Sequence, residues 1–212
     1  MKLVLLGPPG SGKGTQADRM SSTMDLMHLS TGDIFRSESR RKSDLGRAIT
    51  EALESGALVK DELVNAEVFA RIEGIDRFLL DGYPRTVTQA ISLDEFLKVR
   101  DRELSGVLLL AVPDEEVVRR ISSRVVCPSC GFVATRSEGE VGDSCPVCDQ
   151  ELVRRKDDRP EAVRNRLREY HERTDPVVEY YDGRLHRVDG VGSVDAVAER
   201  VNGVVQKLPA DC

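Results

Sequence analysis

The sequence predicts an α/β fold of three layers, in which helices cover both faces of a five-stranded parallel sheet. Short apolar runs alternate along the chain with longer helical patterns, and this alternation is typical of parallel sheets. A glycine-rich loop joins the first apolar run to the first helical pattern. Two stretches, 31–73 and 125–158, interrupt the alternation and therefore predict insertions into the sheet domain.

Four apolar runs are typical of buried parallel strands. In chain order they are Leu3–Leu6, Leu26–Leu29, Phe78–Leu80 and Val107–Val112, and we expect Leu185–Val188 to form the fifth strand. The helical patterns between them include Val87–Arg100, Pro113–Arg124 and Pro160–Tyr181. The stretch 31–73 carries helical patches without a strand, so we expect a helical insertion after the second strand. The stretch 125–158 is rich in glycine, cysteine, serine and charge, so we expect an insertion with its own stabilising device.

Composition indicates a globular protein with an aliphatic core. Apolar residues make up 40% of the 212-residue chain and charged residues 32%, whereas aromatic residues reach only 4% and tryptophan is absent. The net charge of −6 gives no reason to expect nucleic acid or a membrane surface as a partner. No apolar run approaches the roughly 20 residues of a membrane span. Because the first predicted strand begins at residue 2, we expect a cytoplasmic protein without a signal peptide. We also expect the protein to be a monomer.

The loop Gly7–Thr15 is the most specific motif in the chain. It reads GPPGSGKGT, which fits the G-x-x-x-x-G-K pattern of a phosphate-binding loop between a strand and a helix. Its backbone N–H groups and the start of the following helix favour phosphate oxygens, and Lys13 adds a positive charge. Gly14 stands where Ser or Thr normally ligates magnesium, and Thr15 comes one residue late. A plain glycine-rich turn is the alternative, but the motif and its context together predict nucleoside triphosphate binding.

Four cysteines form two C-x-x-C pairs separated by fourteen residues: Cys127 with Cys130, and Cys145 with Cys148. Each pair can place two thiolates on one metal ion, and two pairs complete a tetrahedron. Two disulfides or a redox site are the competing interpretations; the expected compartment disfavours the first and the doubled motif disfavours the second. The spacing therefore predicts a structural Zn²⁺ site in a segment that has few apolar residues of its own. Cys212 is left as an unpaired thiol without a predicted role.

Several polar residues follow the predicted strands or flank the second insertion. Asp81 follows the strand Phe78–Leu80, where a carboxylate can serve magnesium. The arginines of this group are Arg36, Arg85, Arg120, Arg124, Arg155 and Arg166. Taken singly, each arginine is better explained as a solvent-exposed surface residue than as a ligand-binding one. As a group around a phosphate loop, they predict a site for phosphoryl transfer, which needs cations on the equatorial oxygens.

The chain resembles the adenylate kinases in the order and spacing of its motifs. These are Gly7–Thr15, Ser30–Asp33, Asp81–Thr86, Arg155–Asp158 and Val188–Gly190, and together they span nearly the whole chain. The cysteine quartet is similar to the long, zinc-bearing lid of one branch of that family, and GKGT is the sequence that the family carries. The resemblance implies a P-loop core of residues 1–29, 60–124 and 159–212, a helical AMP-binding insertion at 30–59 and a small zinc-ribbon-like lid at 125–158.

The resemblance also implies a role for individual positions. ATP would be bound by Gly10, Ser11, Gly12, Lys13, Gly14, Thr15, Arg120, Arg124, Val133, Ala134 and Gly192. AMP would be bound by Thr31, Arg36, Ala57, Leu58, Val59, Gly82, Tyr83, Pro84, Arg85, Gln89, Arg155 and Arg166, with Gln89 contacting the adenine edge. Catalysis would depend on Lys13, Arg85, Arg124, Arg155 and Arg166, and on Asp81 and Asp157, which would orient Mg²⁺ through its waters.

The implied reaction is Mg·ATP + AMP ⇌ 2 ADP, with lid closure excluding water as a competing acceptor. A kinase of another nucleoside monophosphate, such as UMP or CMP, is the first alternative, although such kinases usually have a short lid. A second alternative is a zinc-ribbon binding module that uses ATP only as a switch. A motor ATPase is a third, but the sequence carries no assembly elements for it.

Overall fold

The computed structural model describes residues 1–39, 60–135, 139–155 and 158–209, and it confirms the five-stranded parallel sheet. The strands are β1 (Lys2–Leu6), β2 (Met27–Ser30), β3 (Phe78–Asp81), β4 (Gly106–Ala111) and β7 (Leu185–Asp189), in the spatial order β2-β3-β1-β4-β7. All four pairings between them are parallel. The carboxyl ends of all five strands therefore lie at one edge of the sheet.

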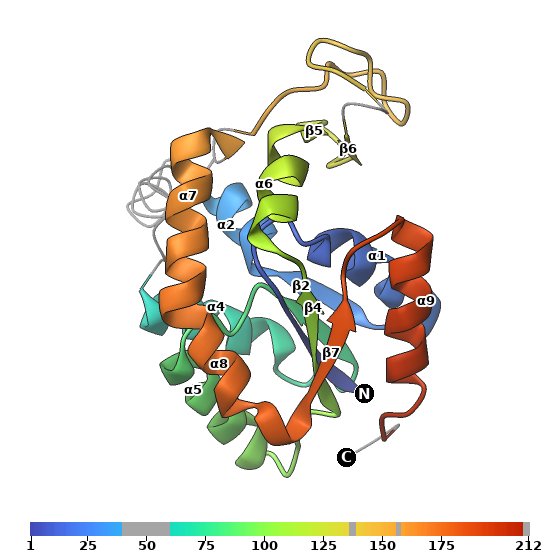
Figure 1. The fold of residues 1–212 in the computed structure, drawn as a ribbon. Helices are drawn as coiled ribbons and strands as arrows, with labels where there is room; N and C mark the ends of the chain where they lie inside the picture. The colour runs from blue at the N-terminus through green and yellow to red at the C-terminus, as the bar shows by residue number, and fades with distance from the viewer. Residues whose placement is uncertain (40–59, 136–138, 156–157, 210–212) are drawn as a thin grey trace.

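Helices cover both faces of this sheet (Figure 1). α1 (Lys13–Met24) and α9 (Val194–Val205) lie on one face, and α4 (Asp61–Ile72), α5 (Val87–Lys98) and α8 (Asp175–Tyr180) lie on the other. α2 (Thr31–Ser39) follows β2 directly, and α6 (Asp114–Ser122) packs on α7 (Pro160–Glu169) through Val117, Ile121, Val163 and Leu167. None of the described helices has the length and apolar character needed to span a membrane.

The two apolar layers follow from the alternation of side chains along each strand. In β1, Val4 and Leu6 pack on the side of α4, α5 and α8, whereas Leu3 and Leu5 pack on the side of α1 and α9. Every residue of β1 is buried, which is why this strand is a continuous apolar run after its first residue. The three-layer prediction is therefore confirmed by the packing as well as by the sheet order.

The helix predicted over Pro160–Tyr181 is interrupted. α7 ends at Glu169, a turn of π-helix covers Tyr170–Thr174, and α8 begins at Asp175. Pro176 explains the interruption, because it has no N–H for the carbonyl four residues earlier and its ring crowds that turn. The second strand begins at Met27, one residue later than predicted, and β4 ends at Ala111, one residue earlier.

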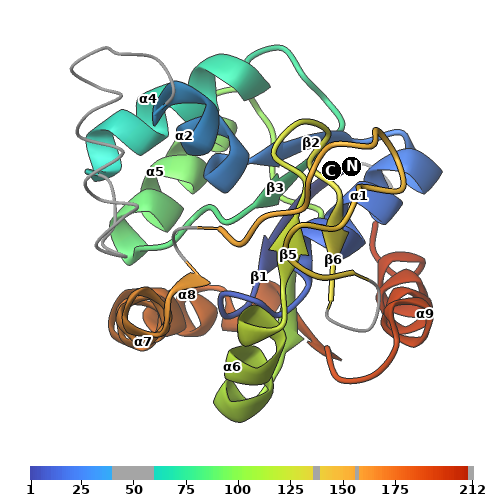
Figure 2. The same cartoon turned by 90° about the horizontal axis from the view of Figure 1, so that it is seen from above.

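The described residues between 125 and 158 are here called the cysteine segment. It contains β5 (Val125–Val126) paired antiparallel with β6 (Val133–Ala134), and two isolated bridges join Val126 to Val153 and Ser144 to Glu151. Its small core consists of Val125, Cys127, Ala134, Cys145 and Leu152. The segment leaves the sheet domain after α6, returns before α7, and lies over the carboxyl ends of the strands (Figures 1 and 2).

Candidate functional site

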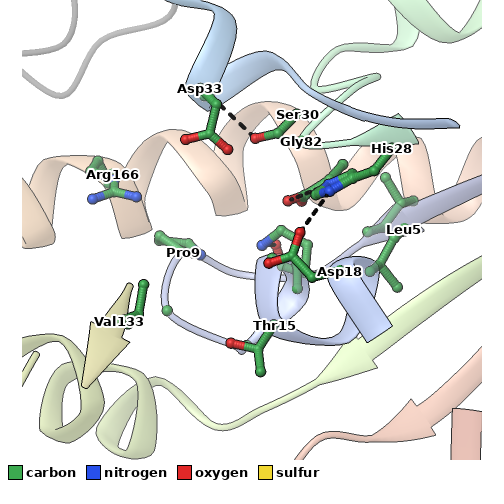
Figure 3. Close-up of a pocket in the computed structure, with 18 of the residues that line it drawn as sticks. Leu5, Pro9, Thr15, Asp18, His28, Ser30, Asp33, Gly82, Val133 and Arg166 are labelled. Carbon is green, nitrogen blue, oxygen red and sulfur yellow. Dashed lines mark hydrogen bonds and ion pairs between the residues drawn. The ribbon is translucent and has the colours of Figure 1, made fainter. Parts of the chain in front are cut away.

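A cleft of about 790 Å³ opens at the carboxyl ends of the strands, between the sheet domain and the cysteine segment. It is lined by the loop after β1, by the β2–α2 junction, by the loop after β3 and by α7. From the cysteine segment, Cys130, Gly131, Phe132, Val133 and Arg155 also line it. Figure 3 shows Arg166 entering from α7, Val133 from β6 and Pro9 from the glycine-rich loop. The cations along its wall are Lys13, Arg19, Arg85, Arg124, Arg155 and Arg166, against Asp18, Asp33, Asp81 and Glu169.

The glycine-rich loop has the form that its sequence predicts. α1 begins at Lys13, directly after Gly12, whose φ of 95° lies in the left-handed region. Gly10 has a φ of 77°, and a Cβ there would lie 2.5 Å from Cγ1 of Ile121 on α6. A side chain at Gly10 would therefore push the loop off α6. Because residue 10 is glycine, the loop packs directly on α6. Its backbone lies at the amino end of α1, where anions are favoured.

The Lys13 side chain folds back over this loop. Its ammonium Nζ donates to the carbonyl oxygens of Gly7 at 2.6 Å and Pro8 at 2.8 Å, and it lies 3.4 Å from Ser11 Oγ. Burial lowers the pKa of Lys13 to about 8; Asp81 opposes this shift, and the nearby arginines add to it. The positive charge of Lys13 is thus only partly compensated in the free protein, which favours an anionic ligand in the cleft.

Asp81 ends β3 beside Lys13, and it is 8% exposed. Nε2 of His28, on the neighbouring strand β2, lies 3.7 Å from its Oδ2, and Nδ1 of His28 lies 2.9 Å from Oδ1 of Asp18 (Figure 3). Burial opposes a charge on His28, but the hydrogen bond and charge of Asp81, together with Asp18, raise the pKa of the imidazole. No sequence motif singled out His28, which enters the site only through the β2–β3 pairing.

The loop after β3 is folded around the carbonyl of Gly82. Arg85 Nε donates to that oxygen at 2.7 Å, and the Thr31 hydroxyl donates to it at 2.9 Å. Gly82, Pro84 and Arg85 line the cleft. Thr31, Tyr83 and Gln89, which the sequence placed in the same subsite, are buried and do not line the described cleft.

Arg124 and Arg166 meet Asp158 where the cysteine segment joins the sheet domain. Arg124 donates through Nε and Nη2 to the two carboxylate oxygens of Asp158, at 2.8 Å for the Nε bond. Arg166 Nη1 lies 3.7 Å from Oδ1 of the same residue. The side chain of Asp158 is completely buried. Sequence reasoning chose Asp157 from this Asp–Asp pair; Asp157 lies outside the described residues, and Asp158 is the carboxylate that ties the two ends of the segment together.

Arg120 is held at the edge of the glycine-rich loop by all three of its guanidinium nitrogens. Nη1 donates to Ser11 O at 3.1 Å, Nη2 to Gly190 O at 3.0 Å and Nε to Glu116 Oε1 at 2.7 Å. Hydrogen bonds from Arg119 and then from Arg120 lower the pKa of Glu116 to about 2. Arg120 therefore connects the glycine-rich loop to the loop after β7.

The remaining predicted positions divide into three groups. Val133 is 42% exposed and lines the cleft, whereas Ala134 is 1% exposed and packs inside the cysteine segment. Gly192 follows β7 and is not part of the cleft wall. The Arg36 side chain and the residues Ala57, Leu58 and Val59 lie outside the described part of the structure.

The four cysteines converge as their spacing predicts. Their Sγ atoms all lie within 4.8 Å of one another, with 3.4 Å between Cys127 and Cys148 and 3.6 Å between Cys130 and Cys145. These distances exceed the roughly 2.05 Å of a disulfide. They are close to the separation of about 3.8 Å that two Zn–S bonds of about 2.3 Å give in a tetrahedron. The Val147 N–H also points at the Cys145 sulfur, at 3.4 Å, so the cluster is compatible with zinc.

Comparison with known proteins agrees with this geometry. The family model described as "Adenylate kinase" matches residues 5–185. The chain is 47% identical to the adenylate kinase of Thermotoga petrophila over 214 aligned positions, which cover 96% of each chain. It is 45% identical to the adenylate kinase of Acetivibrio thermocellus, with 95% of this chain and 96% of the relative covered. For the adenylate kinase of Petrotoga mobilis the identity is 39%, with 98% and 99% covered. The fold, the cleft and these similarities together show that the chain belongs to the adenylate kinase family.

Proposed function

We propose that the protein transfers the terminal phosphate of Mg-ATP reversibly to AMP and so produces two ADP. One observation carries this proposal: Lys13 of the phosphate loop, Asp81 at the end of β3 and four arginines line a single cleft. The four arginines are Arg85, Arg124, Arg155 and Arg166. Phosphoryl transfer spreads negative charge over the equatorial oxygens, and such a ring of cations stabilises that charge.

The two nucleotides would enter the cleft from opposite sides of the phosphate loop. Residues 10–15 would hold the ATP phosphates on the amino end of α1, and Arg120 would cover the ATP base from its anchor between Ser11 and Gly190. Gly82 and Arg85, together with the helical insertion at 30–59, would hold AMP. The division into core, insertion and lid remains our proposal; the small core inside residues 125–158 supports it.

The chemistry needs positioning more than proton transfer. The AMP phosphate oxygens already carry negative charge, so attack on the terminal phosphate of ATP requires no strong base. Lys13 would exchange its bonds to the carbonyls of Gly7 and Pro8 for bonds to phosphate oxygens. Arg124 and Arg166 would turn from Asp158 toward the transferred group. The same arginines also hold the two ends of the cysteine segment together through Asp158.

Two metal ions complete the proposal. Asp81 offers a carboxylate at the strand end beside Lys13, which fits the oxygen ligands that Mg²⁺ prefers. Bound with ATP, Mg²⁺ would supply positive charge that offsets the charge of the phosphates. Cys127, Cys130, Cys145 and Cys148 would hold Zn²⁺, and four thiolates leave no open position for catalysis. Zinc would therefore stabilise the cysteine segment and take no part in the transfer.

The cysteine segment would act as a lid that closes over bound ATP and excludes water. Closure of the adenylate kinase lid is itself one of the standard examples of such motion. The position of the segment above the strand ends and its connections to α6 and α7 support this role (Figure 1). We further propose that the enzyme works as a cytoplasmic monomer without nucleic acid or membrane partners; sedimentation velocity at working concentration tests the monomer.

The decisive experiment measures ADP formation from ATP with AMP, CMP, UMP or GMP as the acceptor. We expect rapid turnover with AMP, much slower turnover with the other acceptors, and loss of nearly all activity in Lys13→Ala with unchanged circular dichroism. Preference for CMP or UMP would make the protein a kinase of another monophosphate. Absence of ADP formation with every acceptor, despite ATP binding, would favour the zinc-ribbon binding module instead.

A further inference from the structure

The side-chain amide of Gln89 is held at both ends by the protein. Its Nε2 lies 2.6 Å from Oδ1 of Asp61, the first residue of α4, and its Oε1 lies 2.7 Å from the backbone nitrogen of Arg85. The second oxygen of Asp61 accepts from the Thr86 hydroxyl at 2.6 Å, and that hydroxyl accepts from the backbone N–H of Gln89 at 3.1 Å. Gln89 itself is 2% exposed. The amide therefore sits in a closed hydrogen-bond network at the start of α5.

Each of the two partners of the Gln89 amide can act only as a hydrogen-bond acceptor or only as a donor. An ionised carboxylate only accepts hydrogen bonds, so the amide nitrogen of Gln89 must face Asp61. A backbone N–H only donates, so the amide oxygen must face Arg85. The orientation of a glutamine amide is usually assigned from its network, and here the network permits a single answer. Each bond uses one N–H or one lone pair, which leaves the amide with one N–H and one lone pair of fixed position.

A fixed N–H beside a fixed lone pair distinguishes purines by their hydrogen-bonding edge. Adenine offers an acceptor at N1 and an amino donor at C6, which pair with an amide N–H and an amide oxygen. Hypoxanthine and guanine offer a donor at N1 and an acceptor at C6, so they need the amide rotated by a half-turn. Rotation would place the amide oxygen against the carboxylate of Asp61 and the amide nitrogen against the Arg85 N–H.

We propose that Asp61 is a positioning residue that sets the purine preference of the acceptor site by locking the Gln89 amide in the orientation that suits adenine. The proposal rests on the proposed function, in which the Gln89 amide contacts the base of AMP. Asp61 acts through Gln89, and its effect is a preference between 6-amino and 6-oxo purines. The backbone N–H of Arg85 favours the same orientation, because it donates to the oxygen at the other end of the Gln89 amide.

The test compares AMP with IMP as acceptors, because IMP carries the 6-oxo edge without the extra amino group of GMP. Asp61→Asn keeps the shape of the side chain but supplies a donor as well as an acceptor, so it removes the restraint at the Asp61 end of the Gln89 amide and leaves only the Arg85 N–H to oppose the rotated orientation. We expect the ratio of kcat/KM for AMP to kcat/KM for IMP to fall about tenfold or more, while the KM for ATP stays unchanged. Asp61→Ser, which also offers both a donor and an acceptor, should lower the same ratio. Glu62→Gln is the matched control, because it removes an exposed carboxylate from the same helical turn and should leave the ratio unchanged.

The results that would contradict the role of Asp61 differ from the result that would contradict the proposed function. Equal losses for AMP and IMP in the Asp61 variants, with an unchanged ratio, would overturn the proposal, because a purely structural residue affects both acceptors alike. Unfolding of both variants, measured by circular dichroism, would overturn it too. Failure of the proposed function has a different signature, since the unmodified protein would then form no ADP from AMP.

Discussion

Lys13 should take up a proton when ATP binds at pH 8. In the free protein its ammonium is buried, and its pKa lies at about 8 instead of 10.5. At pH 8 about half of the molecules therefore carry a neutral lysine. Bound ATP places several negative charges beside Nζ and favours the charged form, so binding should draw in about half a proton per site at that pH.

The lowered pKa of Lys13 determines how the folding stability and the ATP affinity of the protein depend on pH. Between pH 8 and 10.5 the unfolded chain keeps the Lys13 proton while the folded protein loses it, so the stability of the free protein should rise across this window. Lowering the pKa of Lys13 from 10.5 to about 8 corresponds to a penalty of about 3 kcal/mol on its charged form, which the negative charges of bound ATP would offset. ATP affinity should be level below pH 8 and should fall above it.

Isothermal titration calorimetry in two buffers of different ionisation enthalpy measures the proton uptake directly. We expect little uptake by Lys13 at pH 6.5, about half a proton at pH 8 and close to one proton at pH 9. Lys13→Arg is the control, because a guanidinium stays charged throughout this range. Uptake that is absent at pH 8, or that persists unchanged in Lys13→Arg, would refute the reasoning.

Three further predictions concern other parts of the site. Arg85→Ala should raise the KM for AMP about tenfold to hundredfold and leave the KM for ATP nearly unchanged, because a charge-assisted bond to phosphate is worth about 1.5–3 kcal/mol; equal losses would contradict an AMP site at this loop. Glu116→Gln should raise the KM for ATP and not for AMP, since it loosens Arg120, whereas the exposed neighbour Glu115→Gln should change neither. Cys145→Ser should release one zinc ion per chain and lower the unfolding temperature of the cysteine segment while part of the activity survives at low temperature. Metal analysis that finds no zinc in the unmodified protein would remove the basis of that last prediction.

Much of the fold could be predicted from the sequence because its determinants are local. A strand buried on both faces has to be a short apolar run, and β1, β3 and β4 are such runs. The glycine-rich loop is equally local, because a backbone with positive φ at Gly10 and Gly12 is specified by the residues themselves. The cysteine cluster followed from spacing alone, since two short knuckles can meet around one ion with little help from the rest of the chain.

Only the tertiary structure decided which side chains meet across long sequence separations. Asp158 closes on Arg124 from 34 residues away, because the two ends of the cysteine segment are brought together by α6 and α7. His28 reaches Asp81 through the pairing of β2 with β3, and Asp61 reaches Gln89 through the packing of α4 on α5. A sequence pattern specifies which residues are apolar, flexible or charged, but the partner of a buried polar group depends on how the layers pack, and that packing is a property of the whole chain.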